Sequence, residues 1–313
     1  MKEPGTPPLI AIFGGDGFIG RYVCEALLKT GARLRIAGRD PRRAWFLQPL
    51  GSTGQVSAVP ADITKPVSFA NVIDGADAVI NLVGVFKGDL EAIHGDGPGK
   101  LAAAAKKAGV KAFVHISALG ADPDSPSEYG QTKGRGEQAV RAGFAKATII
   151  RPSTVFGPED QFTNRFAAMA GASTLPVIAP RTRFQPLYVR DLAQAIAAAA
   201  LDPAAHGGKT YELGGPEAMS MRELNEQVAA LSGQHPDIAE VPDFVAAGIA
   251  AFGFLPGAPL SRDQWLMLKR DSVPSGKHPG FREFGITPTP LGAVAPEWLS
   301  RYKKGGRFAP SVA

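Results

Sequence analysis

The sequence predicts an α/β protein in which helices cover both faces of a doubly wound parallel sheet, with a smaller C-terminal capping lobe. Three observations lead to this prediction. Short apolar segments with the length of buried strands alternate with longer segments of helical spacing through the first half of the chain. A glycine-rich turn joins the first strand-like segment to the first helix-like one. Beyond residue 157 the alternation weakens, which indicates a second, smaller lobe.

Six strand-like segments are expected to form the sheet, because each is a short and largely apolar run bounded by turn residues. They are residues 9–14, 33–38, 55–62, 76–84, 111–119 and 147–157. Helices are predicted over residues 18–31, 101–110 and 127–143. Strands that are connected through helices pair in parallel with right-handed crossovers, so the helices lie on both faces. Ligands bind such sheets beyond the carboxyl ends of the strands.

The second half of the chain is predicted to return to the main sheet and then to build the smaller lobe. Residues 185–201 are expected to form a short strand and a helix, residues 211–214 another strand, and residues 221–232 an amphipathic helix. The apolar run at 244–260 is expected to be core of the lobe, with a face for lipid or a hydrophobic subunit as the alternative.

These elements set the predicted domain boundaries. Residues 1–205 form the sheet domain, with 158–184 partly in the small lobe, residues 206–300 form the C-terminal substrate or interaction lobe, and residues 301–313 form a basic tail.

The composition is that of an ordinary globular protein, with 44% hydrophobic and 20% charged residues. The net charge of +5 suits a phosphate-rich ligand, an anionic membrane surface or an acidic partner. Lys and Arg are scattered and form no recognised binding motif, so no nucleic acid is expected as a partner. The five histidines and single cysteine have no metal-ligand spacing, so no metal is expected.

The N-terminus and the hydropathy pattern predict a cytoplasmic protein. Residues 1–8 lack the basic-then-apolar order of a signal peptide. No apolar run free of Pro and Gly reaches the roughly 18 residues of a membrane span. A peripheral position on the cytoplasmic face of the inner membrane remains compatible with this prediction.

A glycine motif follows the first strand-like segment, with Gly14, Gly17 and Gly20 spaced as G-x-x-G-x-x-G. Gly14 permits a tight turn, Gly17 lets the backbone approach a pyrophosphate, and Gly20 allows the helix to pack closely on the strand. The helix that begins at Phe18 and Ile19 offers unpaired N–H groups and a partial positive charge to phosphates. The position of the motif between a buried strand and an amphipathic helix predicts a Rossmann-type dinucleotide-binding domain.

The end of the second strand-like segment indicates NADP(H) rather than NAD(H). Sites that prefer NAD(H) usually carry an acidic residue there for the ribose hydroxyls. Here the segment ends in Gly38-Arg39, with Arg42 and Arg43 close behind. A guanidinium can pair with a 2′-phosphate through two charge-assisted hydrogen bonds, so Arg39 and Arg43 are the predicted ligands. Asp40 leaves NAD(H) as the less favoured alternative.

Residues at the ends of two further strands are expected to contact the cofactor. Asp62 and Ile63, after the third strand, are placed to frame the adenine. The loop after the fourth strand is expected to line the middle of the cofactor, and it consists of Asn81, Leu82, Val83 and Gly84.

Three residues form a predicted catalytic group. Ser117 lies at the end of the fifth strand, and Tyr129 and Lys133 follow as a Y-x-x-x-K pair on one helix face. The ammonium of Lys133 is expected to lower the pKa of Tyr129 and to hold the nicotinamide ribose. Tyr129 would then act as general acid to a carbonyl that Ser117 orients. His115 is interpreted as a structural residue with its hydrogen bonds satisfied.

The combination resembles the extended or atypical short-chain dehydrogenase/reductases. Residues 151–158 (RPSTVFGP) match the segment that lines the nicotinamide in that family. The resemblance therefore implies cofactor contacts from Pro152, Ser153 and Val155. Residues 187–193 (LYVRDLA) match the family's later strand-to-helix junction.

More narrowly, the chain resembles the group named for the 39-kDa accessory subunit of respiratory complex I. The resembling segments are residues 17–23, 159–166, 185–189, 260–264 and 284–291. In that subunit the family picture is a tightly held NADPH with a structural role and no established turnover. The resemblance implies an NADP(H)-binding protein with an accessory or assembly role in complex I or quinone metabolism. Its partner would be a respiratory-chain membrane complex or a membrane surface.

An enzymatic role is the alternative that the resemblance leaves open. In ordinary reductases of the family the same residues carry out hydride transfer. The chain would then be a free-standing NADP-dependent oxidoreductase or epimerase-like enzyme. Ser117, Tyr129 and Lys133 would act on a small carbonyl or quinone-like substrate.

Overall fold

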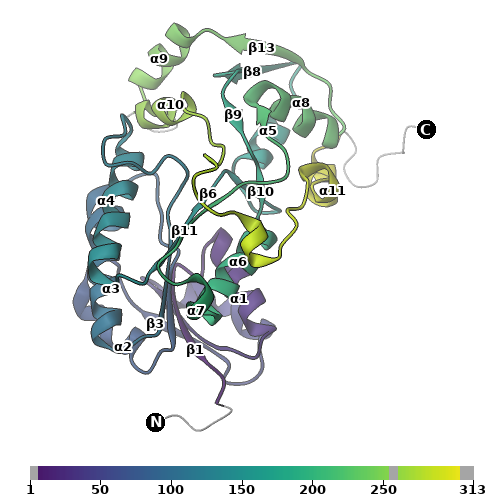
Figure 1. Cartoon of the computed structure of the whole chain (residues 1–313). Coiled ribbons are helices and arrows are strands. Elements are labelled where there is room, and N and C mark those ends of the chain that lie inside the picture. The colour runs from purple at the N-terminus through teal and green to yellow at the C-terminus, as the bar shows by residue number, and fades with distance from the viewer. Residues whose placement is uncertain (1–5, 254–259, 304–313) are drawn as a thin grey trace. The chain divides into compact units, whose positions relative to one another are not determined.

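The computed structural model describes residues 6–253 and 260–303 (Figure 1). The chain divides into two compact units. The first contains Met1–Pro152, Val189–Leu213 and Gly276–Ile286, and the second contains Ser153–Tyr188, Gly214–Ser275 and Thr287–Ala313.

The first unit is built on a seven-stranded parallel sheet with the strand order β11-β6-β5-β4-β1-β2-β3. The strands are β1 (Leu9–Phe13), β2 (Arg33–Gly38), β3 (Val56–Pro60), β4 (Ala78–Asn81), β5 (Ala112–Ile116), β6 (Thr148–Pro152) and β11 (Thr210–Leu213). The order reverses between β1 and β4, and such a switch point is where ligands bind in doubly wound sheets. The predicted fold class is confirmed.

Helices cover both faces of this sheet (Figure 1). They are α1 (Phe18–Leu28), α2 (Ala70–Ile73), α3 (Gly97–Lys107), α4 (Glu128–Gly143), α6 (Val189–Leu201) and α7 (Pro203–His206). α3 packs against α4 on one face, and α1 packs against α6 on the other. Every residue of β4 and β5 is buried, which explains why these central strands read as continuous apolar runs.

Short helical turns complete the first unit. They are η1 (Pro41–Leu50), η2 (Pro66–Ser68), the π-helical η3 (Glu91–Asp96) and η4 (Phe281–Phe284). The segment that contains η4 returns to the first unit late in the chain. The Glu212 N–H donates to the Pro279 carbonyl at 3.0 Å, and the Phe284 ring stacks on His206 at 4.5 Å. No sequence pattern indicated this return, so the predicted boundaries do not contain it.

In the residues that the structure describes, the second unit contains three two-stranded sheets and short helices. The paired strands are β7 (Val155–Phe156) with β10 (Leu187–Tyr188), β8 (Thr174–Ile178) with β13 (Asp237–Val241), and β9 (Arg183–Phe184) with β12 (Met219–Ser220). The helices are α5 (Thr163–Met169), α8 (Met221–Leu231), α9 (Asp243–Ala251), α10 (Arg262–Leu268), α11 (Leu291–Val294), α12 (Pro296–Leu299) and η5 (Ser300–Tyr302). The aromatic rings of Phe156, Tyr188 and Trp298 stack together within this unit.

The prediction that residues 244–260 form core is wrong for α9 and for Phe252, although Leu260 at the end of the run is buried. Only Ala246 and Ala250 of α9 are buried. Phe244 is 78% exposed and Phe252 is 64% exposed. The apolar residues of this run lie all around the helix, so packing of the two alanines leaves the large side chains outside. Residues 254–259 of the run, and the predicted basic tail beyond residue 303, lie outside the described residues.

No helix in the described residues has both the length and the apolar character needed to cross a membrane. Within the same residues, no three His, Cys, Asp or Glu side chains gather into a group that could hold a metal ion.

Candidate functional site

The glycine motif lies between β1 and α1, at the switch point of the sheet. Gly14 has a φ of +80°, and a Cβ on it would lie 3.2 Å from the Leu82 carbonyl carbon and the Val83 nitrogen. A Cβ on Gly20 would lie 2.6 Å from Gly15 Cα, so α1 meets the turn backbone to backbone. Both positions therefore require glycine.

Gly17 has a different environment. It is the N-cap of α1 with a φ of −84°, and a Cβ on it would meet only the Gly14 carbonyl oxygen, at 3.3 Å. No side chain caps the helix and no acidic residue lies in its first turn. The first N–H groups of a helix, here those of Phe18 and Ile19, have no intrahelical acceptor. This end of α1 therefore fits a pyrophosphate, which would occupy the space that a side chain at Gly17 would fill.

The basic residues after β2 differ in their partners. Arg42 donates two hydrogen bonds of 2.9 Å to the carboxylate of Asp40, and this pairing holds the pKa of Asp40 below its usual value. Arg43 lies 3.2 Å from Asp16 of the glycine turn. Arg39 is exposed, and within residues 6–253 and 260–303 it forms no ion pair. The Asp40 carboxylate is thus engaged, whereas the exposed Arg39 guanidinium feels the charge of Asp62 without pairing with it and is available to an anion.

Asp62 and Ile63 follow β3 as predicted, and both side chains have roles in the fold. The Asp62 carboxylate accepts hydrogen bonds from the Thr64 N–H at 3.0 Å and the Thr64 hydroxyl at 2.8 Å. Ile63 is buried in the core between the sheet and α3. An adenine contact from Asp62 would therefore share its carboxylate with this turn.

The loop after β4 lies between the glycine turn and Lys133. Its Leu82–Val83 backbone packs on Gly14, as described above. A Cβ on Gly84 would lie 3.7 Å from Lys133 Nζ. The Lys133 ammonium donates to the Ile116 carbonyl at the end of β5, at 3.0 Å. The structure thus brings the predicted loop 82–84 and the predicted lysine together.

Tyr129 lies one helical turn before Lys133 on α4, beneath two aromatic residues that sequence reasoning missed. The Phe86 ring stacks on the Tyr129 ring at 5.0 Å and 22°. His94 meets the same ring edge-on at 5.3 Å. Phe86 lies in a loop and His94 in the short π-helical η3, and neither segment has an apolar period, so no local signal could have placed them beside Tyr129.

Burial controls the ionisation of this pair. It raises the pKa of Tyr129 to about 12 and lowers the pKa of Lys133 to about 8, with the charge of Glu137 opposing the second shift. The expectation that Lys133 lowers the pKa of Tyr129 is therefore wrong for this structure. The lysine ammonium is directed to the Ile116 carbonyl and lies 5.8 Å from the centre of the tyrosine ring. Tyr129 stays protonated at neutral pH and can donate a hydrogen bond.

Replacement of Phe86 by alanine is expected to lower the pKa of Tyr129 from about 12 toward the ordinary value of about 10. Phe86 is itself 60% exposed and shields the phenol beneath it from water. A pH titration of ¹³Cζ-labelled tyrosine by NMR would measure the change, with the Tyr129→Phe spectrum assigning the signal. Phe244→Ala, at another exposed phenylalanine, is the control. An unchanged Tyr129 titration would mean that other residues provide its burial.

Ser117 carries an unsatisfied hydroxyl. The side chain is 3% exposed, and its Oγ has no hydrogen-bond partner among the residues that the structure describes. A buried polar group without a partner costs about 1–3 kcal/mol. Such a group needs a partner that the described fold does not supply, and the role of Ser117 stays a prediction.

The three residues predicted from the RPSTVFGP segment lie on both sides of the division along the chain that separates the two units. Pro152 ends β6 in the first unit, and its carbonyl accepts a hydrogen bond from the Leu119 N–H at 3.1 Å. Ser153 and Val155 belong to the second unit. The Ser153 hydroxyl donates to the Ser272 carbonyl there at 2.7 Å. A cofactor contact from these residues stays a prediction.

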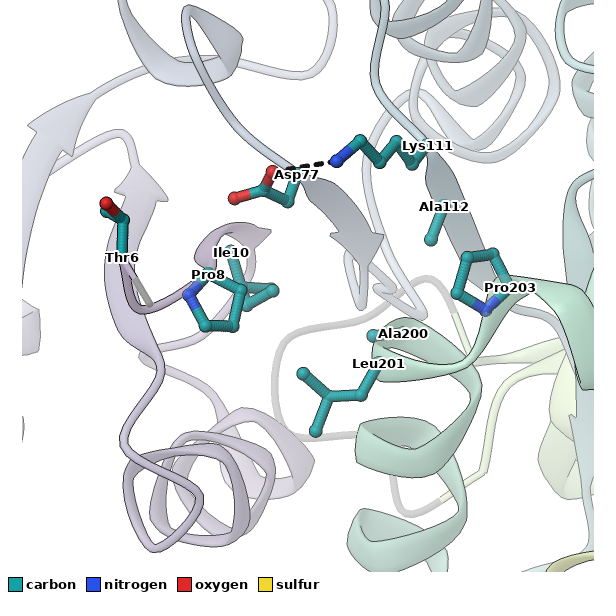
Figure 2. A pocket seen from close by; sticks show the side chains of 9 residues that line it. All are labelled: Thr6, Pro8, Ile10, Asp77, Lys111, Ala112, Ala200, Leu201 and Pro203. Carbon is teal, nitrogen blue, oxygen red and sulfur yellow. Dashed lines mark ion pairs between the residues drawn. The ribbon is translucent and has the colours of Figure 1, made fainter. Parts of the chain in front are cut away.

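A cavity of about 410 Å³ lies at the other end of the strands, near the N-terminal ends of β1, β4 and β5 (Figure 2). Its lining residues are Thr6, Pro8, Ile10, Asp77, Lys111, Ala112, Ala200, Leu201 and Pro203. The Asp77 carboxylate accepts from the Leu9 N–H at 2.9 Å and lies 3.7 Å from Lys111 Nζ. Nucleotides bind at the carboxyl ends of the strands, so this cavity at the amino-terminal ends is separate from the candidate site.

Comparison with known proteins gives the chain its family. Residues 10–214 match the NAD dependent epimerase/dehydratase family. The subunit named NADH dehydrogenase (ubiquinone) 1 alpha subcomplex subunit 9, mitochondrial, of Arabidopsis thaliana is 33% identical over 96% of this chain and 80% of its own length. A ceramide reductase of Caulobacter vibrioides is 30% identical over 75% of this chain and 74% of its own length.

The solved structures agree on the fold. An NADPH-dependent quinone oxidoreductase of Escherichia coli, solved with NADPH, matches with a TM-score of 0.74 and 22% identity. The match covers 93% of this chain and 99% of that one. The chain is thus a member of the NAD dependent epimerase/dehydratase family, together with the NADH dehydrogenase subunit that it resembles along nearly its whole length.

Proposed function

We propose that this chain holds NADP(H) at the carboxyl ends of β1, β2 and β4. The observation that carries this proposal is the difference between Arg39 and Asp40 after β2. Asp40 is paired with Arg42, whereas Arg39 is exposed and forms no ion pair in the described residues. A 2′-phosphate would therefore meet a guanidinium at this position.

Other residues would hold the remaining parts of the nucleotide. The α1 N-terminus at Gly17 would bind the pyrophosphate, and the loop 82–84 would line its middle. Lys133 would hold the nicotinamide ribose from α4. The nucleotide, when bound, supplies a hydride to an acceptor or accepts one from a donor.

We propose further that the chain serves as an accessory or assembly protein of a respiratory NADH dehydrogenase. The similarity to the Arabidopsis subunit over 96% of this chain supports this proposal, because it includes the second unit as well as the nucleotide-binding one. The partner would be a membrane complex of the respiratory chain. The chain would lie peripherally on the cytoplasmic face of the membrane.

A second candidate function is reduction of a small carbonyl or quinone-like substrate. The unpaired Ser117 hydroxyl favours it, because a purely structural nucleotide site would not need an unpaired donor directly after the Ile116 carbonyl that Lys133 contacts. Ser117 would orient the substrate oxygen, and the protonated Tyr129 hydroxyl would donate its proton to that oxygen.

One experiment tests both functions. The protein is purified without added nucleotide and denatured, and the released nucleotide is identified and quantified. The intact holoprotein is then mixed with isotope-labelled NADPH to measure exchange. Stoichiometric NADPH that does not exchange over hours supports the accessory role, whereas exchange within seconds supports turnover. Release of NAD(H) alone, or affinity for neither nucleotide, contradicts the proposed site.

Arg39→Ala is expected to weaken NADPH binding by about 10- to 100-fold and to leave NADH binding within about twofold. A charge-assisted hydrogen-bonding group contributes about 1.5–3 kcal/mol, and NADH lacks the phosphate that would use it. Isothermal titration of both nucleotides on the nucleotide-free protein measures the difference. Arg222→Ala removes the same charge from an exposed site in the second unit and serves as control. Equal losses for both nucleotides would show that Arg39 does not contact a 2′-phosphate.

A further inference from the structure

A pair of buried polar residues links the two central strands at the candidate site. Asn81 ends β4 and lies directly opposite His115 of β5 in the parallel register. Both side chains are fully buried, and Asn81 Nδ2 lies 3.1 Å from His115 Nδ1. Buried polar groups lower stability unless they are paired. The two side chains pair with each other here, and the direction of each hydrogen bond decides which atom donates and which accepts.

The hydrogen bond from the following loop fixes the direction of the whole chain of bonds. The Val83 N–H donates to Asn81 Oδ1 at 3.1 Å. A backbone N–H can only donate, so the amide nitrogen of Asn81 must face His115. His115 Nδ1 must then accept, which places the proton of the neutral ring on Nε2. Burial, and secondarily the charge of Lys133, lowers the pKa of His115 and keeps the ring neutral.

The hydrogen bonds of His115 and Asn81 hold the loop 82–84, and this loop borders the proposed nucleotide site. The Leu82 N–H donates to the Phe13 carbonyl at 2.9 Å, and the Val83 nitrogen packs against Gly14 of the glycine turn. A Cβ on Gly84 would lie 3.7 Å from Lys133 Nζ. Without Asn81 held in place, the Val83 N–H would lose its acceptor and the loop its fixed position between these two groups.

We infer that His115 is a positioning residue of the nucleotide site, which acts through Asn81 to hold the loop 82–84 and does not touch the nucleotide itself. This inference rests on the proposed nucleotide binding. The His115 atom that holds Asn81 is Nδ1, since Nε2 has no hydrogen-bond partner among the residues that the structure describes. The interpretation of His115 as a fully satisfied structural histidine is therefore only half right.

Two amide substitutions separate the atoms of the ring. His115→Asn places an amide oxygen close to the position of Nδ1, and His115→Gln places its amide close to the position of Nε2. We expect His115→Gln and His115→Phe to accelerate NADPH dissociation about tenfold, as loss of one buried hydrogen bond would. His115→Asn is expected to stay within about threefold of the wild type. Fluorescence of the holoprotein, chased with excess NADP⁺ and followed until exchange is complete, measures the dissociation rates on the scale of seconds or of hours.

The order of the NADPH dissociation rates among the variants distinguishes a positioning role of His115 from a role in packing alone. Asn leaves a larger cavity than Gln, so a purely structural role would make His115→Asn the worse variant. That order, or four indistinguishable dissociation rates, would overturn the inference. If the wild-type chain binds neither NADPH nor NADH, the proposed function fails instead.

A measurement on the wild-type holoprotein needs no variant to fold. In ¹⁵N-labelled histidine NMR spectra, His115 should show a protonated Nε2 and an unprotonated Nδ1 across neutral pH. A protonated Nδ1 would contradict the direction of the hydrogen bonds and overturn the inference.

Discussion

Gly20→Ala is expected to destabilise the first unit by about 3 kcal/mol and to abolish nucleotide binding. The new Cβ would lie 2.6 Å from Gly15 Cα, and neither α1 nor the turn can move without separating β1 from the helix that follows it. Such overpacking against backbone is at the upper end of the usual cost of 1–3 kcal/mol. Urea unfolding followed by circular dichroism would measure the loss of stability, and titration with NADPH the loss of binding.

Gly17→Ala is the matched control, since it adds the same methyl group three residues earlier. Its Cβ would meet only the Gly14 carbonyl oxygen at 3.3 Å, and the φ of −84° is accessible to alanine. The expected loss of stability is about 1 kcal/mol, typical of alanine at an N-cap. Binding should still weaken at least about tenfold, because the methyl group would occupy the phosphate position. Tight NADPH binding by Gly17→Ala would show that the pyrophosphate lies elsewhere.

Arg151→Met is expected to destabilise the protein by about 3–5 kcal/mol. Arg151 of β6 donates to both oxygens of Glu137 on α4, at 2.8 and 2.6 Å, and lies 3.5 Å from Glu212 of β11. The side chains of the three residues are 23%, 9% and 7% exposed. Removal of the arginine leaves two carboxylates buried without their counter-charge, and breaking such a pair has this cost. Urea unfolding measures the change.

The pairing with Glu137 also gives the control. In an Arg151→Met/Glu137→Gln double variant a neutral amide replaces one of the two unpaired carboxylates, so part of the lost stability should return. Lys100→Met removes an exposed i,i+4 partner of Asp96 and should change stability by less than about 0.5 kcal/mol. A cost below about 1 kcal/mol for Arg151→Met would mean that water reaches the three side chains in solution.

The sequence predicted the sheet because its strands are buried on both faces and read as apolar runs. The burial of β4 and β5 at every position shows this directly. The glycine turn was also predictable, since its spacing reflects local contacts between Gly14, Gly17 and Gly20. Tyr129 and Lys133 lie one helical turn apart, and a four-residue spacing is sufficient to predict that.

Features that depend on distant segments were not predictable. Phe86 and His94 pack on the ring of Tyr129 from two other segments of the chain. The apolar residues of the three segments share no period, so the sequence does not indicate these contacts. The sign of the Tyr129 pKa shift follows from burial of the phenol beneath these two rings. The return of the η4 segment depends on Phe284 reaching His206. In α9, the apolar composition suggested core, but composition does not say which neighbours a helix has.

The buried, unpaired hydroxyl of Ser117 links the stability of the protein, and therefore its rate of degradation in a cell, to the binding of a ligand. The ligand-free fold carries the cost of that unpaired group, about 1–3 kcal/mol, and a ligand that hydrogen-bonds to it removes the cost. Any ligand present at a hundredfold excess over its Kd adds about 2.7 kcal/mol to the stability of the folded state. Proteases act on the fraction that unfolds, so the abundance of this chain would follow the supply of its ligand rather than its rate of synthesis alone.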